Sequence, residues 1–411
     1  MKALYERCCG IDVHKRIVVA CLKCGKKQEI REFGTTTEEL RSLTEWLSDS
    51  KCQMIAMEST GSYWKPLYNI FELSSLAAIV VNARDMRNVP GRKTDIKDAE
   101  WIADLLQHGL LRASYIPNRE QRELRELSRY RKSLIEERAR ELNRLQKMLE
   151  GGNIKLASVV SDINGRSARN LLTHMLKRDT SLTKEEVSSL VRGRLRHKVE
   201  SIMKALDGFL TPLQKQLMLK VVDHIDDMTK RIGEMDDLMN QYLTEYHEAI
   251  QKLDEIPGIG RQSAETILAE TGLDMSRFPT AKHFSSWAGL APGNNESAGK
   301  RRYGRTTKGN ITLKTTLIQC AKAAVKKTDS FLSAQYQRLV VRRGANRATV
   351  AVAHTMLISI YHMLKNNVPF TDLGADYYNR FNTQSKIQHY LKKLKQLGWE
   401  LDSATIPTAA V

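Results

Sequence analysis

Four acidic residues have the types and spacing of a metal-dependent catalytic site. Asp12 closes a short β-rich run, Glu58 follows another, and Asp95 and Asp98 are three residues apart, which places both carboxylates on one face of a helix. Four clustered carboxylates repel one another unless divalent cations neutralise them, and their hard oxygens favour Mg²⁺, with Mn²⁺ as an alternative. Two such ions stabilise attacking and leaving oxygens in phosphoryl transfer. Each acid alone also has a structural interpretation, such as a first-turn residue favoured by the helix dipole, but their joint placement favours catalysis.

A serine set among basic residues is the second candidate for chemistry. No acidic residue lies between Ser297 and position 310. A serine hydroxyl needs a base, a metal or local cationic charge to act as a nucleophile, and a basic cluster binds a scissile phosphate and stabilises its developing charge. The alternatives are a flexible basic loop with an incidental serine, or one of the weaker candidates Ser285 and Ser286. The basic residues are Lys300, Arg301, Arg302, Arg305 and Lys308.

A glycine-containing turn at 256–260 is a candidate phosphate-binding element. Gly258 and Gly260 precede a helical run over 263–271, so backbone N–H groups of the turn and of the helix N-terminus can approach a phosphate. This pattern resembles the helix-hairpin-helix module of DNA-repair proteins, although a simple Pro-Gly turn between helices looks the same. Further candidate contacts to a nucleic-acid backbone are Lys322, Lys326, Lys327, Arg338, Arg342, Arg343 and Arg347.

The composition favours a polyanionic partner. The chain has 411 residues, of which 41% are hydrophobic and 27% charged, so wholesale disorder, a collagen-like chain and a disulfide scaffold are excluded. The net charge is +18 and the pI is about 9.6, which favours nucleic acid over mere solubility charge. Residues 1–115, 116–250 and 251–411 carry net charges of +2, +4 and +12.

Cysteine usage and hydropathy indicate a cytoplasmic protein. Cys21 and Cys24 form a lone CxxC with no second Cys or His pair nearby, so reduced, packed thiols are expected rather than a zinc site. The N-terminus has no uninterrupted apolar run, and we therefore expect no signal peptide. The longest uncharged apolar stretch, 348–364, is short for a bilayer span and predicts a buried helix.

The elements that must position these residues form an α/β domain followed by helices. Three β-rich runs over 8–33 precede a helix–strand–helix–strand pattern that ends near 81, and a helix follows over 95–108. Apolar residues near a 3.5-residue period predict a long helix over 119–150, with coiled-coil character. An irregular stretch, a helix over 211–252 and a mostly helical C-terminal region follow. The expected divisions are 1–115, 116–250, 251–380 and a basic tail over 381–411.

Three sequence blocks resemble the Asp-Glu-Asp-Asp (DEDD) transposase family, which includes insertion-sequence transposases and the Piv/MooV DNA invertases. They are GIDVHK from Gly10, MESTGSYW from Met57 and KTDIKDAEWIADLL from Lys93. The resemblance implies an RNase H-like domain similar to the RuvC Holliday-junction resolvase, with Asp12, Glu58, Asp95 and Asp98 as the metal-binding tetrad. Downstream, WAGLAP from Trp287 and the Ser297 region resemble the family's C-terminal domain, which implies Ser297 as the nucleophile; Ala298 departs from the commoner Ser-Gly-Gly pattern.

The resemblance implies an insertion-sequence transposase that cleaves and rejoins donor and target double-stranded DNA. It also implies a structured non-coding guide RNA, termed a bridge RNA, and a homo-oligomer, either a dimer or a tetramer. One alternative is a junction-resolving metal nuclease that uses water and does not need Ser297. A DNA invertase is another, and a non-enzymatic nucleic-acid-binding coiled-coil protein is the third. No membrane association is expected.

Overall fold

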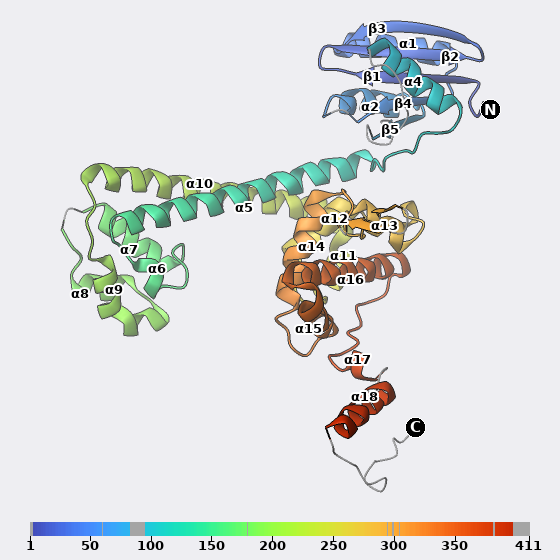
Figure 1. Ribbon diagram of the computed structural model, residues 1–411. Coiled ribbons are helices and arrows are strands. Elements are labelled where there is room, and N and C mark those ends of the chain that lie inside the picture. The colour runs from blue at the N-terminus through green and yellow to red at the C-terminus, as the bar shows by residue number, and fades with distance from the viewer. Residues whose placement is uncertain are drawn as a thin grey trace. The chain divides into compact units, whose positions relative to one another are not determined.

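The computed structural model describes residues 3–59, 61–82, 95–178, 180–293, 295–297, 300–303, 305–380 and 383–397. The chain divides into two compact units, residues 1–120 and 121–411. The first contains a β-sheet with helices, and the second is almost entirely helical (Figure 1). The predicted combination of an N-terminal α/β domain with a helical C-terminal region is therefore confirmed.

The N-terminal unit is built on one five-stranded sheet. In the sheet the strands take the order β3-β2-β1-β4-β5. β1, β2 and β3 form an antiparallel meander, whereas β4 and β5 run parallel to β1. The predicted three antiparallel strands followed by two further strands are thus confirmed. The bounds are β1 (Arg7–Val13), β2 (Ile17–Cys24), β3 (Lys27–Gly34), β4 (Met54–Glu58) and β5 (Ala78–Val81).

Helices cover both faces of this sheet. On one face Leu43 of α1 and Phe71 of α2 share a core with Ile11 of β1. On the other face Ile102 of α4 packs with Cys8. Thr36 caps α1 by accepting a hydrogen bond from the Glu39 backbone, and Gly109, at a positive φ of 69°, follows α4 as the sequence predicts. The bounds are α1 (Thr37–Asp49), α2 (Trp64–Leu73) and α4 (Asp95–Gln107).

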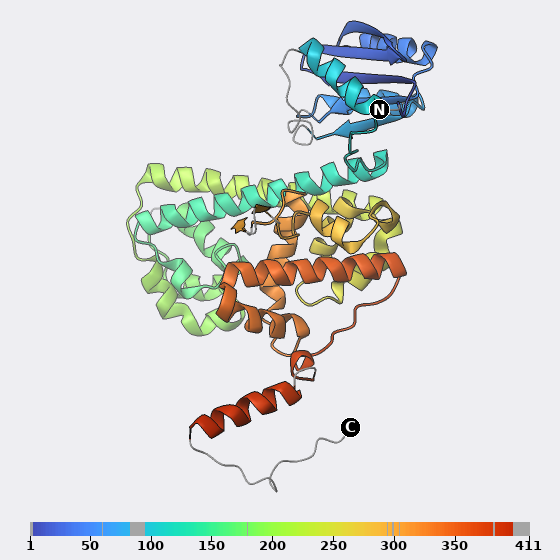
Figure 2. The ribbon, with the colours of Figure 1, turned by 45° about the vertical axis from the view of Figure 1, so that its right-hand side comes forward.

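Two long helices, α5 and α10, pack antiparallel in the second unit (Figure 2). Their bounds are Arg119–Gly151 and Pro212–Tyr242. The Arg138 side chain hydrogen-bonds Thr229 at 3.3 Å, and Arg131, nearer the start of α5, contacts Asp236 near the end of α10 at 3.3 Å. The predicted long amphipathic helix is confirmed, and a helix of the same chain covers part of its apolar stripe. Coiled-coil geometry stays a prediction.

Between α5 and α10 the chain folds into a helical subdomain, residues 152–211. The expectation of an irregular stretch is wrong here, because several short amphipathic helices bury leucines such as Leu171, Leu172 and Leu176. Thr183 and Glu186 form a capping box at the start of α8. The elements are α6 (Leu156–Val159), α7 (Arg166–Leu176), α8 (Lys184–Leu190), the 3₁₀ helix η1 (Gly193–Lys198) and α9 (Val199–Leu206).

The single helix predicted over 211–252 is wrong as well. α10 ends at Tyr242, a 3₁₀ turn η2 (Thr244–Tyr246) follows, and α11 (His247–Asp254) is a separate helix. The apolar pattern runs unbroken through Leu243 and Ile250, both buried. Apolar periodicity therefore does not reveal the interruption between α10 and α11. The separate helix α11 packs against α12 (Arg261–Thr271).

The remaining C-terminal helices surround α16 (Ala345–Asn366). Its centre is fully buried at Ala353, Met356 and Leu357, so the predicted core helix is confirmed. Among the described residues no helix is long and apolar enough to cross a membrane. The other elements are η3 (Met275–Arg277), α13 (Ala281–Trp287), β6 (Asn295–Ser297), β7 (Lys300–Tyr303), α14 (Ile311–Ala324), α15 (Phe331–Arg343), α17 (Tyr377–Arg380) and α18 (Thr383–Gln396).

Candidate active site

Asp12 and Glu58 lie side by side at the carboxyl ends of two parallel strands. β1 pairs with β4 so that Ile11 stands opposite Met57, and the next residue of each strand is the acid. Ile11 and Met57 belong to the core beneath α1. Because successive side chains of a strand point to opposite faces, Asp12 and Glu58 face the side of the sheet that α4 covers.

α4 brings Asp98 to the same face. The backbone of α4 crosses β1 so closely that a Cβ atom added to Gly10 would lie 2.2 Å from the Ala103 nitrogen and 2.4 Å from the Ala99 carbonyl oxygen. No side chain fits between them, and only glycine permits this approach. Asp98 immediately precedes Ala99, so the contact at Gly10 fixes the first turns of α4 against the strand that carries Asp12.

The electrostatics of Asp12 are those of a carboxylate in a crowded acidic site. Its side chain is buried, with 8% of its surface exposed, and this burial raises the pKa of Asp12 above its usual value. The carboxylates of Asp98 and Glu58 raise it further. His14 opposes them, because its Nε2 lies 3.0 Å from Asp12 Oδ2. The negative charges of both other acids therefore act on the Asp12 carboxylate, as expected if the three acids face one site.

The donor set fits a hard divalent cation by its chemistry. Asp12, Glu58 and Asp98 supply only carboxylate oxygens, and their mutual repulsion is the effect that a bound cation removes. Within the described side chains no three His, Cys, Asp or Glu groups are already close enough to hold an ion. The Asp95 side chain lies outside the described residues; its backbone begins α4, one turn before Asp98.

Ser297 is the last residue of β6, at the end of a short hairpin. In the β6–β7 ladder it stands opposite Lys300, and Glu296 stands opposite Arg301. The side chains of Ser297 and of Lys300, Arg301 and Arg302 lie outside the described residues. The backbone nevertheless places the serine directly across from the first residue of the basic run. Arg305 and Lys308, which follow the hairpin, have exposed side chains.

A buried carboxylate that sequence reasoning missed anchors the segment after this hairpin. Glu270 of α12 is fully buried and accepts hydrogen bonds from Arg129 of α5, at 2.6 and 2.8 Å, and from the Asn310 amide at 2.6 Å. Asn310 also caps α14 by accepting the Leu313 N–H. This contact ties α5 and α12 to the loop that follows Lys308. Nothing in the periodicity distinguishes Glu270 from an exposed helical acid.

The two glycines of the 256–260 turn have different structural roles. Gly258 has a φ of +84°, and a Cβ atom there would lie 2.3 Å from the Cys320 carbonyl oxygen of α14. This glycine is required for packing between helices. Gly260 precedes α12 and has open space around its Cβ position. Of the two positions, only that of Gly260 has space for a side chain.

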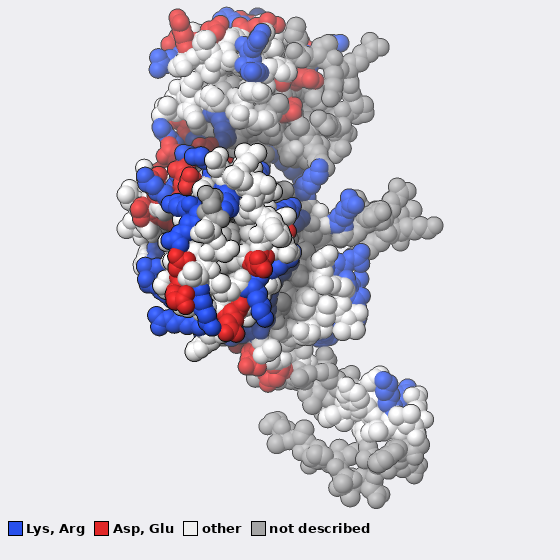
Figure 3. Space-filling model, turned by 90° about the vertical axis from the view of Figure 1, so that its left-hand side faces the viewer, with Lys and Arg blue, Asp and Glu red and all other residues white. Residues whose placement is uncertain are grey.

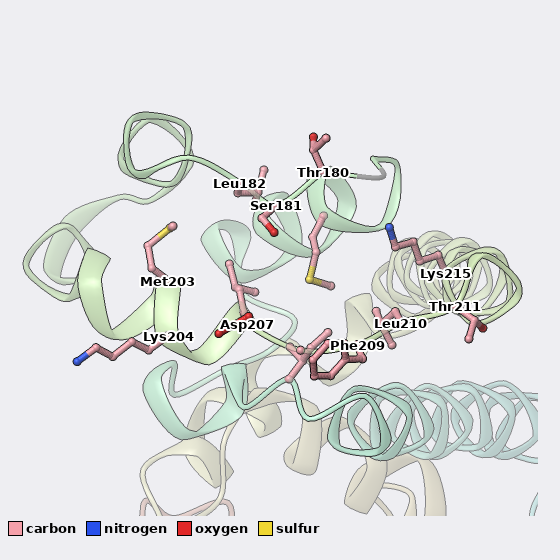
Figure 4. Close-up of a pocket in the computed structure, with 14 residues that line it drawn as sticks. Thr180, Ser181, Leu182, Met203, Lys204, Asp207, Phe209, Leu210, Thr211 and Lys215 are labelled. Atoms are coloured by element: carbon pink, nitrogen blue, oxygen red, sulfur yellow. The ribbon is translucent and has the colours of Figure 1, made fainter.

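The Ser285 hydroxyl and the Cys21 thiol, two other candidate reactive groups of the sequence, are both buried. The Ser285 hydroxyl is buried and donates to the Ala281 carbonyl within α13, which makes it unsuitable as a nucleophile. Burial raises the pKa of the Cys21 thiol to about 11, consistent with a packed, unreactive thiol. A pocket of about 600 Å³ in the helical subdomain (Figure 4) is lined partly by Met203, Phe209 and Leu210, and none of the proposed site residues contributes to it.

Two family models match the chain. Residues 9–154 match a model described as "Transposase". Residues 250–337 match one described as "Transposase IS116/IS110/IS902 family". The first match contains Asp12, Glu58, Asp95 and Asp98, and the second contains Ser297.

Curated relatives cover most of the chain. A Pseudomonas aeruginosa protein named "Probable family 20 transposase" is 26% identical over 84% of this chain and 89% of its own length. The transposase for insertion sequence element IS1111A of Coxiella burnetii is 23% identical over 86% of this chain and 88% of its own. A protein of insertion element IS110 from Streptomyces coelicolor is 28% identical over 67% of this chain and 72% of its own.

Proposed function

We propose that the chain is the transposase of an insertion sequence and cleaves and rejoins DNA, because two of its segments match transposase models, one of them that of the IS116/IS110/IS902 family. The proposal is supported by the placement of Asp12 and Glu58 at the ends of adjacent parallel strands and of Asp98 on the helix that covers that face, within a segment that matches a transposase model. The sheet order, with an antiparallel meander and two parallel strands, is consistent with the RNase H-like fold that the resemblance implies.

In this proposal the four acids hold Mg²⁺, which neutralises them and stabilises charge on the phosphate oxygens. Asp12 and Glu58 are fixed by the strand register, whereas Asp95 and Asp98 are fixed by α4. Ser297 Oγ forms a bond to the scissile phosphorus while the bond from phosphorus to the leaving deoxyribose oxygen breaks. The serine proton passes to solvent or to the leaving oxygen, and the basic residues beside Ser297 hold the phosphate.

Three further parts of the proposal rest on the resemblance. They are a structured non-coding guide RNA, a homo-oligomer, and the assignment of Gly258 and Gly260 to a helix-hairpin-helix phosphate site. For the last, the open space at Gly260 supports a role in binding, whereas the close contact of Gly258 with α14 supports a role in packing.

Adduct formation tests the nucleophile. Purified protein is incubated with element-end DNA and Mg²⁺, and covalent protein–DNA species are measured on denaturing gels and mapped by mass spectrometry. Ser297→Ala is expected to abolish the adduct, whereas Ser286→Ala, an exposed serine on α13, is the matched control and retains it. An adduct undiminished by Ser297→Ala would contradict the assignment. Cleavage that persists without any adduct would support the water-using nuclease instead.

Strand cleavage tests the metal site. Asp98→Asn is expected to abolish Mg²⁺-dependent cleavage while DNA binding, measured in chelator, stays unchanged. Asp104→Asn is the control on the same helix, because Asp104 forms an ion pair with Lys23 instead of facing Asp12. Equal loss of cleavage in both variants would show that α4 merely needs its acids for folding.

A further inference from the structure

A second concave surface lies in the helical subdomain, outside both matched family regions. A groove of about 440 Å³ runs between the start of α7 and η1. The Arg192 backbone N–H donates to the Ser167 hydroxyl at 3.0 Å, and the Lys198 ammonium donates to the Val159 carbonyl at 3.2 Å. These contacts hold η1 against α6 and α7, so the groove is formed by packed elements.

The groove is strongly basic. Arg166, Arg194 and Lys198 line it, and Asp162 is the acid among its lining residues. The Asp162 carboxylate already accepts the Asn164 backbone N–H at 2.8 Å. Within the described residues none of the three basic side chains has a carboxylate partner, and all three are exposed. Figure 3 faces this end of the second unit and shows Lys and Arg interspersed with Asp and Glu on its surface.

The shape and chemistry of the groove favour phosphate groups. The N-terminus of α7 faces it through Gly165, which provides no side-chain cap, so the first-turn N–H groups add to the positive potential of the basic side chains. Guanidinium, ammonium and hydroxyl groups are the usual partners of phosphate oxygens. The like charges that line the groove repel one another, and a bound anion removes that repulsion.

The groove lacks the aromatic groups that bind single strands: no Phe, Tyr or Trp is among its lining residues, and the exposed Phe209 of the subdomain lines the other pocket. Residues 131–208 contain no Phe, Tyr or Trp, whereas single-stranded nucleic acid is bound largely by stacking bases on aromatic side chains. A surface with cationic donors and no aromatic platform is suited to the sugar–phosphate backbone of a duplex. Because the proposed transposase acts on double-stranded DNA, duplex DNA is the partner that this surface fits.

We infer that the groove formed by Arg166, Arg194 and Lys198 binds the phosphate backbone of duplex DNA, at a distance along the chain from both the acidic site and Ser297. The inference extends the proposed function by a second DNA contact. Binding is measured without cleavage, so the failure of either proposal can be distinguished from the failure of the other.

The experiment compares two double variants of the full-length protein. Arg194→Ala with Lys198→Ala removes two charges from the groove. Arg140→Ala with Lys147→Ala removes two exposed charges from α5. The affinity for a fluorescent 30-base-pair duplex is measured by anisotropy at several salt concentrations in chelator. The groove variant is expected to lower the slope of log K against log salt by about 2 and to raise the Kd about tenfold at 0.1 M salt; the α5 variant changes both far less.

Further arms of the experiment separate binding from folding and DNA from RNA. Arg194→Lys with Lys198→Arg keeps the charge and is expected to retain duplex binding, and thermal melting verifies that each variant is folded. Equal effects of the groove and α5 variants would overturn the inference, because they would reflect general charge alone. A loss confined to single-stranded DNA or to a hairpin RNA, with duplex DNA binding unchanged, would also overturn it.

Discussion

Substitution of Gly10 by alanine tests how α4 positions the acidic site. Gly10 lies in β1 two residues before Asp12, directly beneath the backbone of α4. The new Cβ would meet backbone atoms, the Ala103 nitrogen and the Ala99 carbonyl oxygen, instead of a movable side-chain end. α4 must therefore shift, because no rotamer change can relieve the contact.

The size of the shift follows from the contact distance. The Cβ would lie 2.2 Å from the Ala103 nitrogen, and ordinary van der Waals contact begins at 3.4 Å, so α4 must retreat by about 1.2 Å. Overpacking of this kind costs about 1–3 kcal/mol of folding free energy. Since Asp98 is carried by α4, its carboxylate moves away from Asp12, and a misplacement of about 1 Å costs about 100-fold in rate.

The assay measures Mg²⁺-dependent strand cleavage together with thermal unfolding. Gly10→Ala is expected to reduce the cleavage rate about 100-fold at a temperature where the variant remains folded. The matched control is Gly233→Ala in α10, where a Cβ meets nothing within 4 Å. That variant is expected to keep its activity and to gain up to about 1 kcal/mol, because alanine favours a helix interior over glycine.

Two results would refute this reasoning. Wild-type cleavage and stability in Gly10→Ala would show that α4 does not press on β1 as described. Reduced stability with an unchanged cleavage rate would show that α4 packs there without positioning Asp98 for the reaction.

Three other predictions concern two buried acids and a glycine in close contact with a neighbouring helix. Burial and the neighbouring acids raise the pKa of Asp12 in the folded state above its value in the unfolded state. Ionisation of Asp12 therefore destabilises the fold as the pH rises from the unfolded-state pKa through the folded-state pKa. In chelator at pH 7.5, Asp12→Asn should raise the melting temperature, and a lower melting temperature would contradict this expectation. Glu270→Gln should cost about 2–3 kcal/mol in urea unfolding, because Arg129 loses its buried carboxylate partner; an unchanged midpoint would count against the anchor. Gly258→Ala should destabilise the fold by about 1–3 kcal/mol, whereas Gly260→Ala should leave thermal stability unchanged. Equal melting temperatures of the two variants would show that the two glycines do not differ in their packing roles.

The strands and long helices of the fold are predictable because their signals are local. β-rich runs separated by short turns specify β1, β2 and β3, and a long apolar stripe among charges specifies α5. The helical subdomain was not predictable in the same way. Its helices are short, and their apolar residues meet one another only after the chain folds back between α5 and α10.

Part of the candidate site was also predictable. Residue type and position identify Asp12 and Glu58 as strand-end acids and place Asp95 and Asp98 on one helix. Their common face is decided by the register Ile11 to Met57, which sequence alone does not give. The role of Glu270 depends on α5, whose contacting Arg129 is 141 residues away along the chain, so no local pattern could reveal it.

The sequence specifies the chemistry that is available: hard carboxylates in the first unit, a serine beside cationic residues in the second, and a surplus of positive charge to attract a polyanion. Which of these groups meet depends on the way the chain folds. Side-chain alternation and strand pairing turned Asp12 and Glu58 toward α4, and the missing side chain of Gly10 allowed that helix to approach. Chemical type is a property of each residue, whereas convergence depends on backbone contacts between segments far apart in the chain.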